Sequence, residues 1–337
     1  MKYKFCTILS IFVFMNSILF ANANEKILFA TNWLAQPEHG GFYQALGDNE
    51  YSKCGLDVEI IQGGPQVNNR AKLIAGKIDF YMGGNMIQPI LARSQGIPIK
   101  VVAAYFQKDP QIIMTHKNAG ADNWEDAKKT YPLYISDTGF VSFYQWMINE
   151  HKFTEEQRRP YTYNSAPFIA NKNSGQQGYL TSEPFSILNK TGEEPNVFLL
   201  SDYGFDSYST TIEIMEEKII NNSGVVECFI NASNIGWVNY LYGNPEKANA
   251  FIKYHNPDIT DEQIAYSIGK IKIHGIVDSG SSLELGIGSM THERQTSFYN
   301  KMVKSGILSN NLNYKDAYTL EYVNKSIGLT EKEILLK

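Results

Sequence analysis

Short apolar runs alternate with longer amphipathic stretches through the first third of the chain. The short runs are rich in β-branched and aromatic residues and end at Gly or Pro, which is typical of strands, whereas the longer stretches favour helices. We predict strands at 26–31, 56–61, 77–84 and 99–106, and helices at 39–53, 67–76 and 86–96. Strands separated by helices of this length form right-handed βαβ units, so this region predicts a parallel sheet flanked by helices.

The alternation of strand-like and helix-like segments is interrupted at Gln107–Pro110, where a polar segment with a proline separates two strand-like runs. A break of this kind suits a chain that crosses from one lobe to another. In the block that follows, we predict strands at 112–116 and 133–137, and helices at 123–129, 140–151 and 168–180.

A return crossing is expected between Ser201 and Thr211, before a strand at 208–215 and a mainly helical remainder. The pattern therefore predicts an α/β protein with two lobes, parallel-rich sheets flanked by helices, and a hinged cleft between the lobes. Lobe 1 is expected to comprise residues 24–107 and 209–337, and lobe 2 residues 108–208.

The first 23 residues have the pattern of a secretory signal peptide. Lys2 and Lys4 precede an apolar run from Ile8 to Phe20, and Ala21-Asn22-Ala23 is an A-x-A cleavage site. The run is short for a membrane span, although an uncleaved N-terminal anchor is the alternative. We expect the mature chain to begin near Asn24 and to work in the periplasm.

Charge and cysteine content narrow the function classes. The net charge is −5 and the basic residues are scattered, which argues against nucleic acid as a partner. After cleavage only Cys54 and Cys228 remain, and two cysteines in an oxidising compartment either pair or stay buried as thiols. They do not form a metal site, and we expect no metal or other cofactor.

The segment NWLAQPEHGG follows the first predicted strand, and ligands of open α/β sheets bind at this end of the strands. It could be a metal site, a catalytic loop or a wall of a binding cleft. A metal site is disfavoured because Glu38 and His39 are adjacent and lack a partner at helical spacing. Catalysis is disfavoured because no nucleophile or paired carboxylate accompanies His39. The remaining alternatives are that His39 caps the next helix, and that Trp33 is either a core residue or a wall of the cleft.

The segment GYLTSEPF, residues 178–185, contains the strongest polar candidate for a ligand-binding residue. Glu183 precedes Pro184 at the end of the predicted helix, so we expect it in an extended loop. There its carboxylate would accept two hydrogen bonds from one edge of a heterocycle, and the alternative is an exposed surface glutamate.

The residues NWLAQPEHGGFYQAL, YSKCGLDVEIIQGG, AGKIDFYMGGN and TSEP resemble a known family. The chain from Lys26 to about Tyr299 is similar to the periplasmic solute-binding proteins of ABC importers for sulfonates, nitrate and thiamine-pyrimidine precursors. The resemblance is closest to the branch of formylaminopyrimidine-binding proteins and thiamine-pyrimidine synthases. It implies a type II-like binding protein that is not an enzyme and acts as a monomer with importer permease and ATPase subunits.

In the pyrimidine binders of this family, aromatic rings sandwich the base and an acidic residue holds its aminopyrimidine edge. Trp33 and Glu183 match these roles, and the looser candidates, chosen by their positions after predicted elements, are His39, Asn85, Phe140, Tyr179 and Tyr208. The synthases also have a cysteine-rich iron-binding segment, which this sequence lacks. Three hypotheses stay open: a receptor for a thiamine-precursor pyrimidine or similar planar heterocycle, a receptor for a sulfonate- or nitrate-type anion, and a pyrimidine-forming enzyme.

Overall fold

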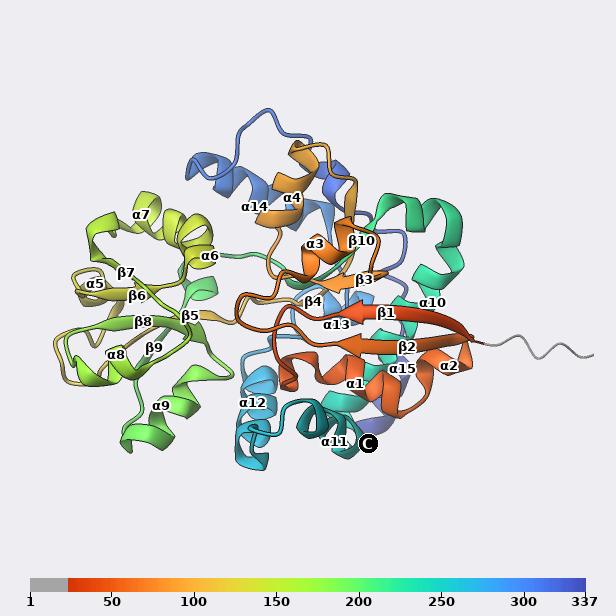
Figure 1. The fold of residues 1–337 in the computed structure, drawn as a ribbon, viewed down its shortest axis with the longest axis horizontal. Helices are drawn as coiled ribbons and strands as arrows, with labels where there is room; N and C mark the ends of the chain where they lie inside the picture. The colour runs from red at the N-terminus through yellow and green to blue at the C-terminus, as the bar shows by residue number, and fades with distance from the viewer. Residues whose placement is uncertain (1–23) are drawn as a thin grey trace, which may run out of the picture.

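A computed structural model describes residues 24–337 and shows two mixed β-sheets flanked by helices (Figure 1). The first sheet has the strand order β2 (Leu56–Ile61), β1 (Glu25–Ala30), β3 (Phe80–Met82), β10 (Ser209–Met215) and β4 (Ile99–Phe106). The second has the order β7 (Arg158–Pro160), β6 (Leu133–Ile135), β8 (Gly175–Tyr179), β5 (Gln111–Thr115) and β9 (Asn196–Leu199). The predicted α/β architecture with two lobes is confirmed. The predicted signal peptide lies outside the described residues.

Each sheet contains two parallel and two antiparallel strand pairs. In the first sheet, the antiparallel strand β10 enters only after the chain has passed through the whole second sheet. We propose that lobe 1 comprises residues 24–107 and 209–337 and lobe 2 residues 108–208, because all strands of each sheet fall within the corresponding ranges.

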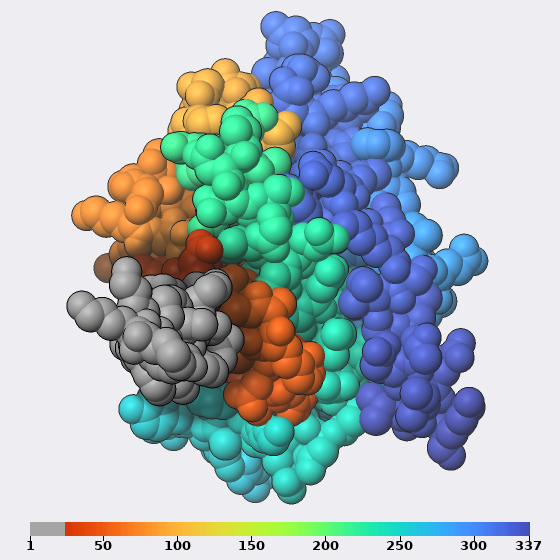
Figure 2. All heavy atoms as spheres, turned by 90° about the vertical axis from the view of Figure 1, so that its right-hand side faces the viewer, coloured from red at the N-terminus to blue at the C-terminus, as the bar shows by residue number. Residues whose placement is uncertain are grey.

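The helices of lobe 1 pack around the first sheet, although Asp57 and Glu59 on the edge strand β2 stay exposed. These helices are η1 (Pro37–His39), α1 (Gly40–Gly47), α2 (Glu50–Lys53), α3 (Asn69–Ile74), α4 (Ile87–Ser94), α10 (Glu216–Tyr242), α11 (Glu246–His255), α12 (Asp261–Ile273), α13 (Ser282–Leu285), α14 (His292–Lys304), η5 (Tyr314–Ala317) and α15 (Leu329–Leu335). In Figure 2, segments from both ends of the chain share one face of this lobe, where α10 lies between the segment of α2 and the C-terminal residues. Within residues 24–337, no helix is both long and apolar enough to cross a membrane.

Lobe 2 has shorter helices around the second sheet. They are α5 (Trp124–Ala127), α6 (Asp137–Gly139), η2 (Phe140–Tyr144), α7 (Gln145–His151), η3 (Glu155–Gln157), α8 (Ala166–Ala170), α9 (Glu183–Thr191) and η4 (Leu200–Tyr203). The predicted helix at 168–180 is wrong, because only its start lies in α8 and its end forms the strand β8. The residues between include Asn171, Asn173 and Ser174, which favour turns over helix.

The double glycine of the PEHGG segment permits a close helix contact in lobe 1. A Cβ atom on Gly41 would lie 2.1 Å from the indole ring of Trp237, and one on Gly40 would lie 2.0 Å from the ring of Tyr240. Both aromatic residues belong to α10 and are buried. The glycines therefore let α1 pack directly on α10, and this packing fixes the loop that leads from Trp33 to His39.

Helix α14 contacts both chain crossings between the lobes. The Arg294 guanidinium donates hydrogen bonds to the backbone carbonyl of Gln107 and to Asp206 Oδ1, the latter at 2.7 Å. It also lies 4.1 Å from the ring centroid of Tyr208. Because Gln107 and Asp206 belong to different crossings, one side chain from lobe 1 holds the two hinge segments together.

Candidate functional site

Two aromatic rings from opposite lobes meet at the carboxyl end of β1. Trp33 follows this strand, and its ring centroid lies 4.6 Å from that of Tyr163 in lobe 2. The backbone carbonyl of Trp33 accepts a 3.0 Å hydrogen bond from Gly63 N and a 2.8 Å bond from Thr31 Oγ1. Trp33 is only partly buried, so its ring forms part of the surface between the lobes.

Glu183 lies on the lobe 2 side of the same interface. It is the first residue of α9, so the expectation of an extended loop after a helix is wrong. Its Oε2 accepts a 2.7 Å hydrogen bond from Tyr179 N, and a Cβ on Gly178 would lie 2.8 Å from Glu183 Cβ. The bare backbone of Gly178 thus allows the glutamate to fold back over the end of β8.

The environment of Glu183 favours its neutral form. Burial raises the pKa of this carboxyl group, while hydrogen bonds from Tyr179 N, its own backbone and Tyr161 act in the opposite direction. A ligand that carries positive charge or strong N–H donors would therefore restore the favourable interactions that burial removes from the carboxylate.

A second carboxyl group, that of Glu38, approaches from lobe 1. Glu38 is 2% exposed, and its Oε1 accepts a hydrogen bond from Thr181 Oγ1 in lobe 2. Burial raises its pKa to about 7, the Thr181 bond lowers it, and the nearby charge of Glu183 raises it further. The sequence analysis considered Glu38 only as a metal ligand, and its role at the interface follows from the way the lobes meet.

A third carboxyl group, that of Asp109, lies in the first crossing. Asp109 is 3% exposed, accepts a 3.1 Å hydrogen bond from Gln111 N, and has a pKa raised to about 7 by burial. The nearby side chain of Asn85 lowers this pKa, and its Nδ2 donates to Ser142 Oγ in lobe 2 at 3.2 Å. Asn85 thus bridges the two lobes, and Asp109 was not predicted.

Tyr179 connects these acidic groups. Burial raises the pKa of its phenol, and the charges of Asp109, Glu38 and Glu183 raise it further. All three carboxyl groups are therefore close enough to Tyr179 to act on it electrostatically. The structure brings together Trp33, Asn85, Tyr179 and Glu183 from the predicted set and adds Glu38 and Asp109.

The acidic groups face neutral partners in the described part of the chain. The main influences on the pKa values of Glu38, Asp109 and Glu183 are burial, neutral hydrogen-bond donors and one another, and none is a lysine or arginine. Arg70, on α3, is already paired: its Nε donates to Glu213 Oε2 at 2.8 Å. The site thus favours a ligand with N–H donors or positive charge over an anion.

Three other predicted residues lie in different surroundings. His39 is 1% exposed, neither ring nitrogen has a hydrogen-bond partner among the described residues, and burial lowers its pKa to about 3. Its ring makes no capping bond to α1. Phe140 stands under the guanidinium of Arg158, which lies 4.9 Å from its ring centroid. Tyr208 is buried in the hinge, where its hydroxyl accepts a 3.1 Å bond from Thr291 N.

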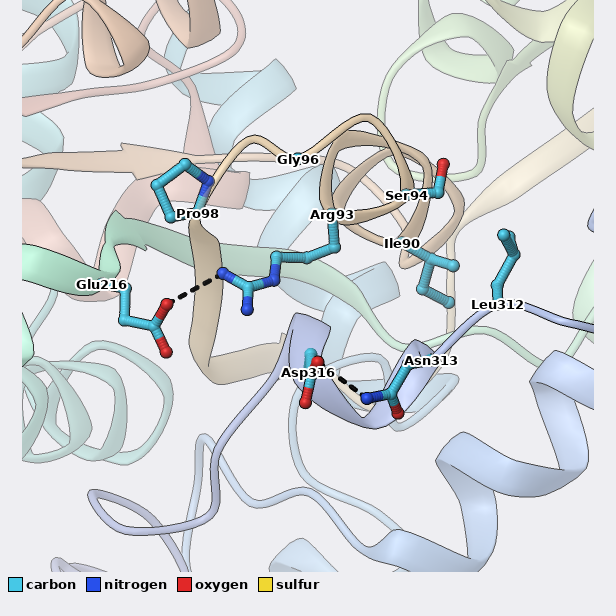
Figure 3. Close-up of a pocket in the computed structure, with 9 residues that line it drawn as sticks. All are labelled: Ile90, Arg93, Ser94, Gly96, Pro98, Glu216, Leu312, Asn313 and Asp316. Carbon is cyan, nitrogen blue, oxygen red and sulfur yellow. Dashed lines mark hydrogen bonds and ion pairs between the residues drawn. The ribbon is translucent and has the colours of Figure 1, made fainter.

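A surface pocket of about 270 Å³ lies on lobe 1 and shares no residue with this group (Figure 3). Its lining consists of Ile90, Arg93, Ser94, Gly96, Pro98, Glu216, Leu312, Asn313 and Asp316. Two of the charges in it are paired, since Arg93 Nη1 lies 3.0 Å from Glu216 Oε2. Within residues 24–337, no group of three or more His, Cys, Asp or Glu side chains is placed to hold a metal ion.

Solved structures share this fold at low sequence identity. The ligand-binding component of an ABC-type import system from Staphylococcus aureus, solved with zinc bound, has a TM-score of 0.65 and 12% identity, covering 91% of this chain and 100% of that chain. The periplasmic aliphatic sulphonate binding protein SsuA from Escherichia coli has a TM-score of 0.62 and 13% identity, covering 87% and 91%. At these identities the likeness establishes the fold alone.

Sequence comparison places the chain in a family. A curated relative, the 4-amino-5-hydroxymethyl-2-methylpyrimidine phosphate synthase of Schizosaccharomyces pombe, is 26% identical over 119 residues, which are 35% of this chain and 34% of that enzyme. The match thus spans about a third of the length of this relative. The family model described as NMT1/THI5 like matches residues 36–248, more than half of the chain. The protein therefore belongs to the NMT1/THI5-like family.

Proposed function

We propose that the protein is an extracytoplasmic substrate-binding protein of an ABC importer and captures a thiamine-precursor pyrimidine. Hydroxymethyl- and formylaminomethyl-pyrimidine, or a similar small planar heterocycle, are the proposed ligands. Membership of the NMT1/THI5-like family and the binding-protein fold support a receptor role. The observation that carries the ligand class is the partly buried Glu183 carboxyl group, which lies with the buried Glu38 and Asp109 between the lobes.

An aminopyrimidine matches both the aromatic side chain and the carboxyl group of this site. Its ring would stack on Trp33, whose indole already faces Tyr163 across the interface. Its exocyclic amino group and a protonated ring nitrogen would donate to Glu183. Charge-assisted hydrogen bonds of this type contribute about 1.5–3 kcal/mol, and the buried setting excludes competing water.

The two alternatives have weaker support. A sulfonate or nitrate receptor would need an unpaired cation near the ligand, and Arg70 is already engaged by Glu213. A pyrimidine-forming enzyme would agree with the synthase relative, but the match covers only a third of each chain. A covalent pyridoxal adduct or bound iron in the purified protein would support the enzyme.

Titration calorimetry decides between these ligand classes. Hydroxymethyl- and formylaminomethyl-pyrimidine should bind the purified mature protein, whereas ethanesulfonate and nitrate should give no heat at the same concentrations. Mass spectrometry of a small molecule retained on native purification would identify the physiological ligand. Binding of the anions without binding of either pyrimidine would replace the proposed ligand class by the anion alternative.

Replacing Trp33 by alanine is expected to weaken pyrimidine binding about tenfold. Stacking of a base on an aromatic side chain contributes about 1–3 kcal/mol, and the partner ring of Tyr163 retains part of the contact after the change. Calorimetry on the variant gives the change in Kd. Tyr254→Ala, at an aromatic residue that is 80% exposed, is the matched control and should leave Kd unchanged. Equal affinities of Trp33→Ala and the wild type would remove Trp33 from the site.

We also propose that the chain is exported and cleaved near Asn24, and that it delivers its ligand as a monomer to importer permease and ATPase subunits. The positive start, apolar run and Ala21-Asn22-Ala23 support this localisation. N-terminal sequencing of protein from the periplasmic fraction should start near Asn24. Recovery of chains that still begin at Met1 in the cytoplasm would contradict export.

A further inference from the structure

The segment between β8 and α9 is held mainly by the opposite lobe. Leu180 and Thr181 belong to lobe 2 and are 3% and 0% exposed. Within lobe 2, Leu180 N donates to Pro110 O at 2.9 Å. The hydroxyl group and the carbonyl oxygen of Thr181, in contrast, both bond to side chains of lobe 1.

Helix α12 supplies most of these contacts. Ser267 Oγ donates to Thr181 O at 2.6 Å, Gln263 Nε2 donates to the same oxygen at 3.2 Å, and Tyr266 OH lies 3.5 Å from Leu180 O. Residues three and four apart share one face of a helix, so these three side chains all point to lobe 2. We call Gln263, Tyr266 and Ser267 the α12 latch.

The α12 latch forms hydrogen bonds to the backbone segment that positions Glu183. Tyr179, on one side of the held segment, donates its N–H to the Glu183 carboxylate, and Glu183 itself begins α9 on the other side. On the same helix, the ring of Phe185 lies 5.2 Å from that of Tyr266. A shift of Leu180 and Thr181 would therefore move both the carboxylate and its backbone donor.

We propose that Ser267 and Gln263 are positioning residues for ligand binding, which act by holding the Leu180–Thr181 segment against lobe 1 when the cleft closes. The proposal rests on the cleft of the proposed function but not on the identity of the ligand. Opening of the lobes breaks the bonds to Thr181, and closing restores them, so the latch stabilises only the closed form. Ligand exchange then depends on side chains that never contact the ligand.

Removal of one latch hydroxyl provides the test. Ser267→Ala should raise the dissociation rate of hydroxymethylpyrimidine about 2- to 10-fold, as expected for the loss of a neutral hydrogen bond, and leave the association rate unchanged. Stopped-flow tryptophan fluorescence measures both rates. Small-angle scattering of the ligand-free protein should show a larger radius of gyration for the variant than for the wild type.

Three variants separate positioning from a general structural effect. Ser267→Thr keeps the hydroxyl group and should restore the wild-type rates, whereas Glu262→Ala, at an exposed position of the same helix, should change nothing. In the Glu183→Gln background, Ser267→Ala should have a smaller effect on dissociation, because the residue that it positions is already impaired.

The outcomes distinguish this inference from the proposed function. Wild-type binding of the pyrimidine with equal dissociation rates and equal radii for Ser267→Ala would overturn the latch and leave the function standing. A larger radius for Ser267→Ala, with no pyrimidine binding by the wild type, would support the latch and remove the proposed ligand.

Discussion

The variant Glu183→Gln should bind hydroxymethylpyrimidine about 10 to 100 times more weakly than the wild type. Glutamine keeps the shape of the side chain, and its carbonyl oxygen can still accept the hydrogen bond from Tyr179 N. It cannot supply the negative charge that a protonated ring nitrogen requires. The loss of a charge-assisted bond, about 1.5–3 kcal/mol, corresponds to this change in Kd.

Titration calorimetry at constant pH and salt measures the effect of Glu183→Gln. Glu194→Gln is the matched control, because Glu194 is also in lobe 2 but is 67% exposed and paired with Lys117. This control should bind as the wild type does. If Glu183→Gln and the control bound equally well, the carboxylate would not be the ligand contact, even with pyrimidine binding intact.

The strands of lobe 1 could be predicted closely because their buried positions carry apolar side chains. The predicted strand at 99–106 coincides with β4, in which seven of eight residues are buried, and 56–61 coincides with β2. Both lie in a sheet covered by helices, where apolar side chains on the strands have packing partners. Periodicity alone was sufficient there, since the same residues satisfy local propensity and tertiary burial.

Strand β8 could not be predicted in the same way, because its centre is polar. Gln176 and Gln177 are both buried, and hydrogen bonds replace the apolar contacts expected of a strand in the middle of a sheet. Gln176 Nε2 donates to Ser165 Oγ at 3.0 Å, and Gln177 Oε1 accepts from Ser136 N at 2.7 Å. The partners are distant in the chain, so the sequence around β8 contains no local sign of them.

The residues of the candidate site also differ in whether the local sequence could predict them. Trp33 and Glu183 could be proposed from their positions after predicted elements and from a family resemblance. Glu38 and Asp109 could not be proposed in this way. Glu38 bonds to Thr181, which is 143 positions away in the sequence, and Asp109 lies in a segment that crosses between the lobes. A buried carboxyl group at an interface between lobes depends on how the lobes meet, which local patterns do not encode.

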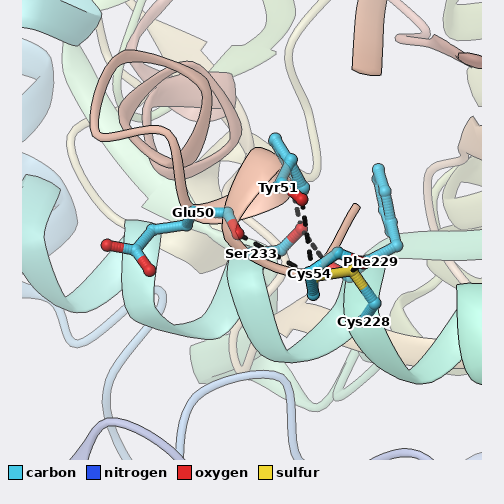
Figure 4. The surroundings of a disulfide bond; sticks show 6 residues. All are labelled: Glu50, Tyr51, Cys54, Cys228, Phe229 and Ser233. Carbon is cyan, nitrogen blue, oxygen red and sulfur yellow. Dashed lines mark hydrogen bonds between the residues drawn. A yellow bond between two sulfur atoms is a disulfide. The ribbon is translucent and has the colours of Figure 1, made fainter. Parts of the chain in front are cut away.

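A disulfide bond in lobe 1, which the sequence left open, closes a long covalent loop. Cys54, at the end of α2, is bonded to Cys228 on α10, 174 positions further along the chain, with a Cα–Cα distance of 6.0 Å (Figure 4). Beside it, Tyr51 stacks on Phe229 and bonds to Ser233 Oγ at 2.9 Å. The bond thus ties the N-terminal part of lobe 1 to the helix that follows the return from lobe 2.

Removing this bond with Cys54→Ser and Cys228→Ser together should lower the free energy of unfolding by about 3–5 kcal/mol. A cross-link over so long a loop restricts the unfolded chain strongly, because the entropy of loop closure grows with the logarithm of loop length. The folded form should persist, since Phe229 also stacks on Phe80 and the surrounding helix contacts remain.

Guanidinium denaturation, followed by tryptophan fluorescence, tests this expectation, with the variant and the oxidised wild type in buffer without reductant and a second wild-type sample in buffer with reductant. The double serine variant has no free thiol to form other disulfides, and the reduced wild type serves as its control and should unfold at a similar denaturant concentration. Trp237, which is buried on α10, the helix that carries Cys228, reports on this part of lobe 1. An unfolding free energy within about 1 kcal/mol of the oxidised wild type would show that helix packing alone already constrains this part of lobe 1, and that the cross-link adds little to it.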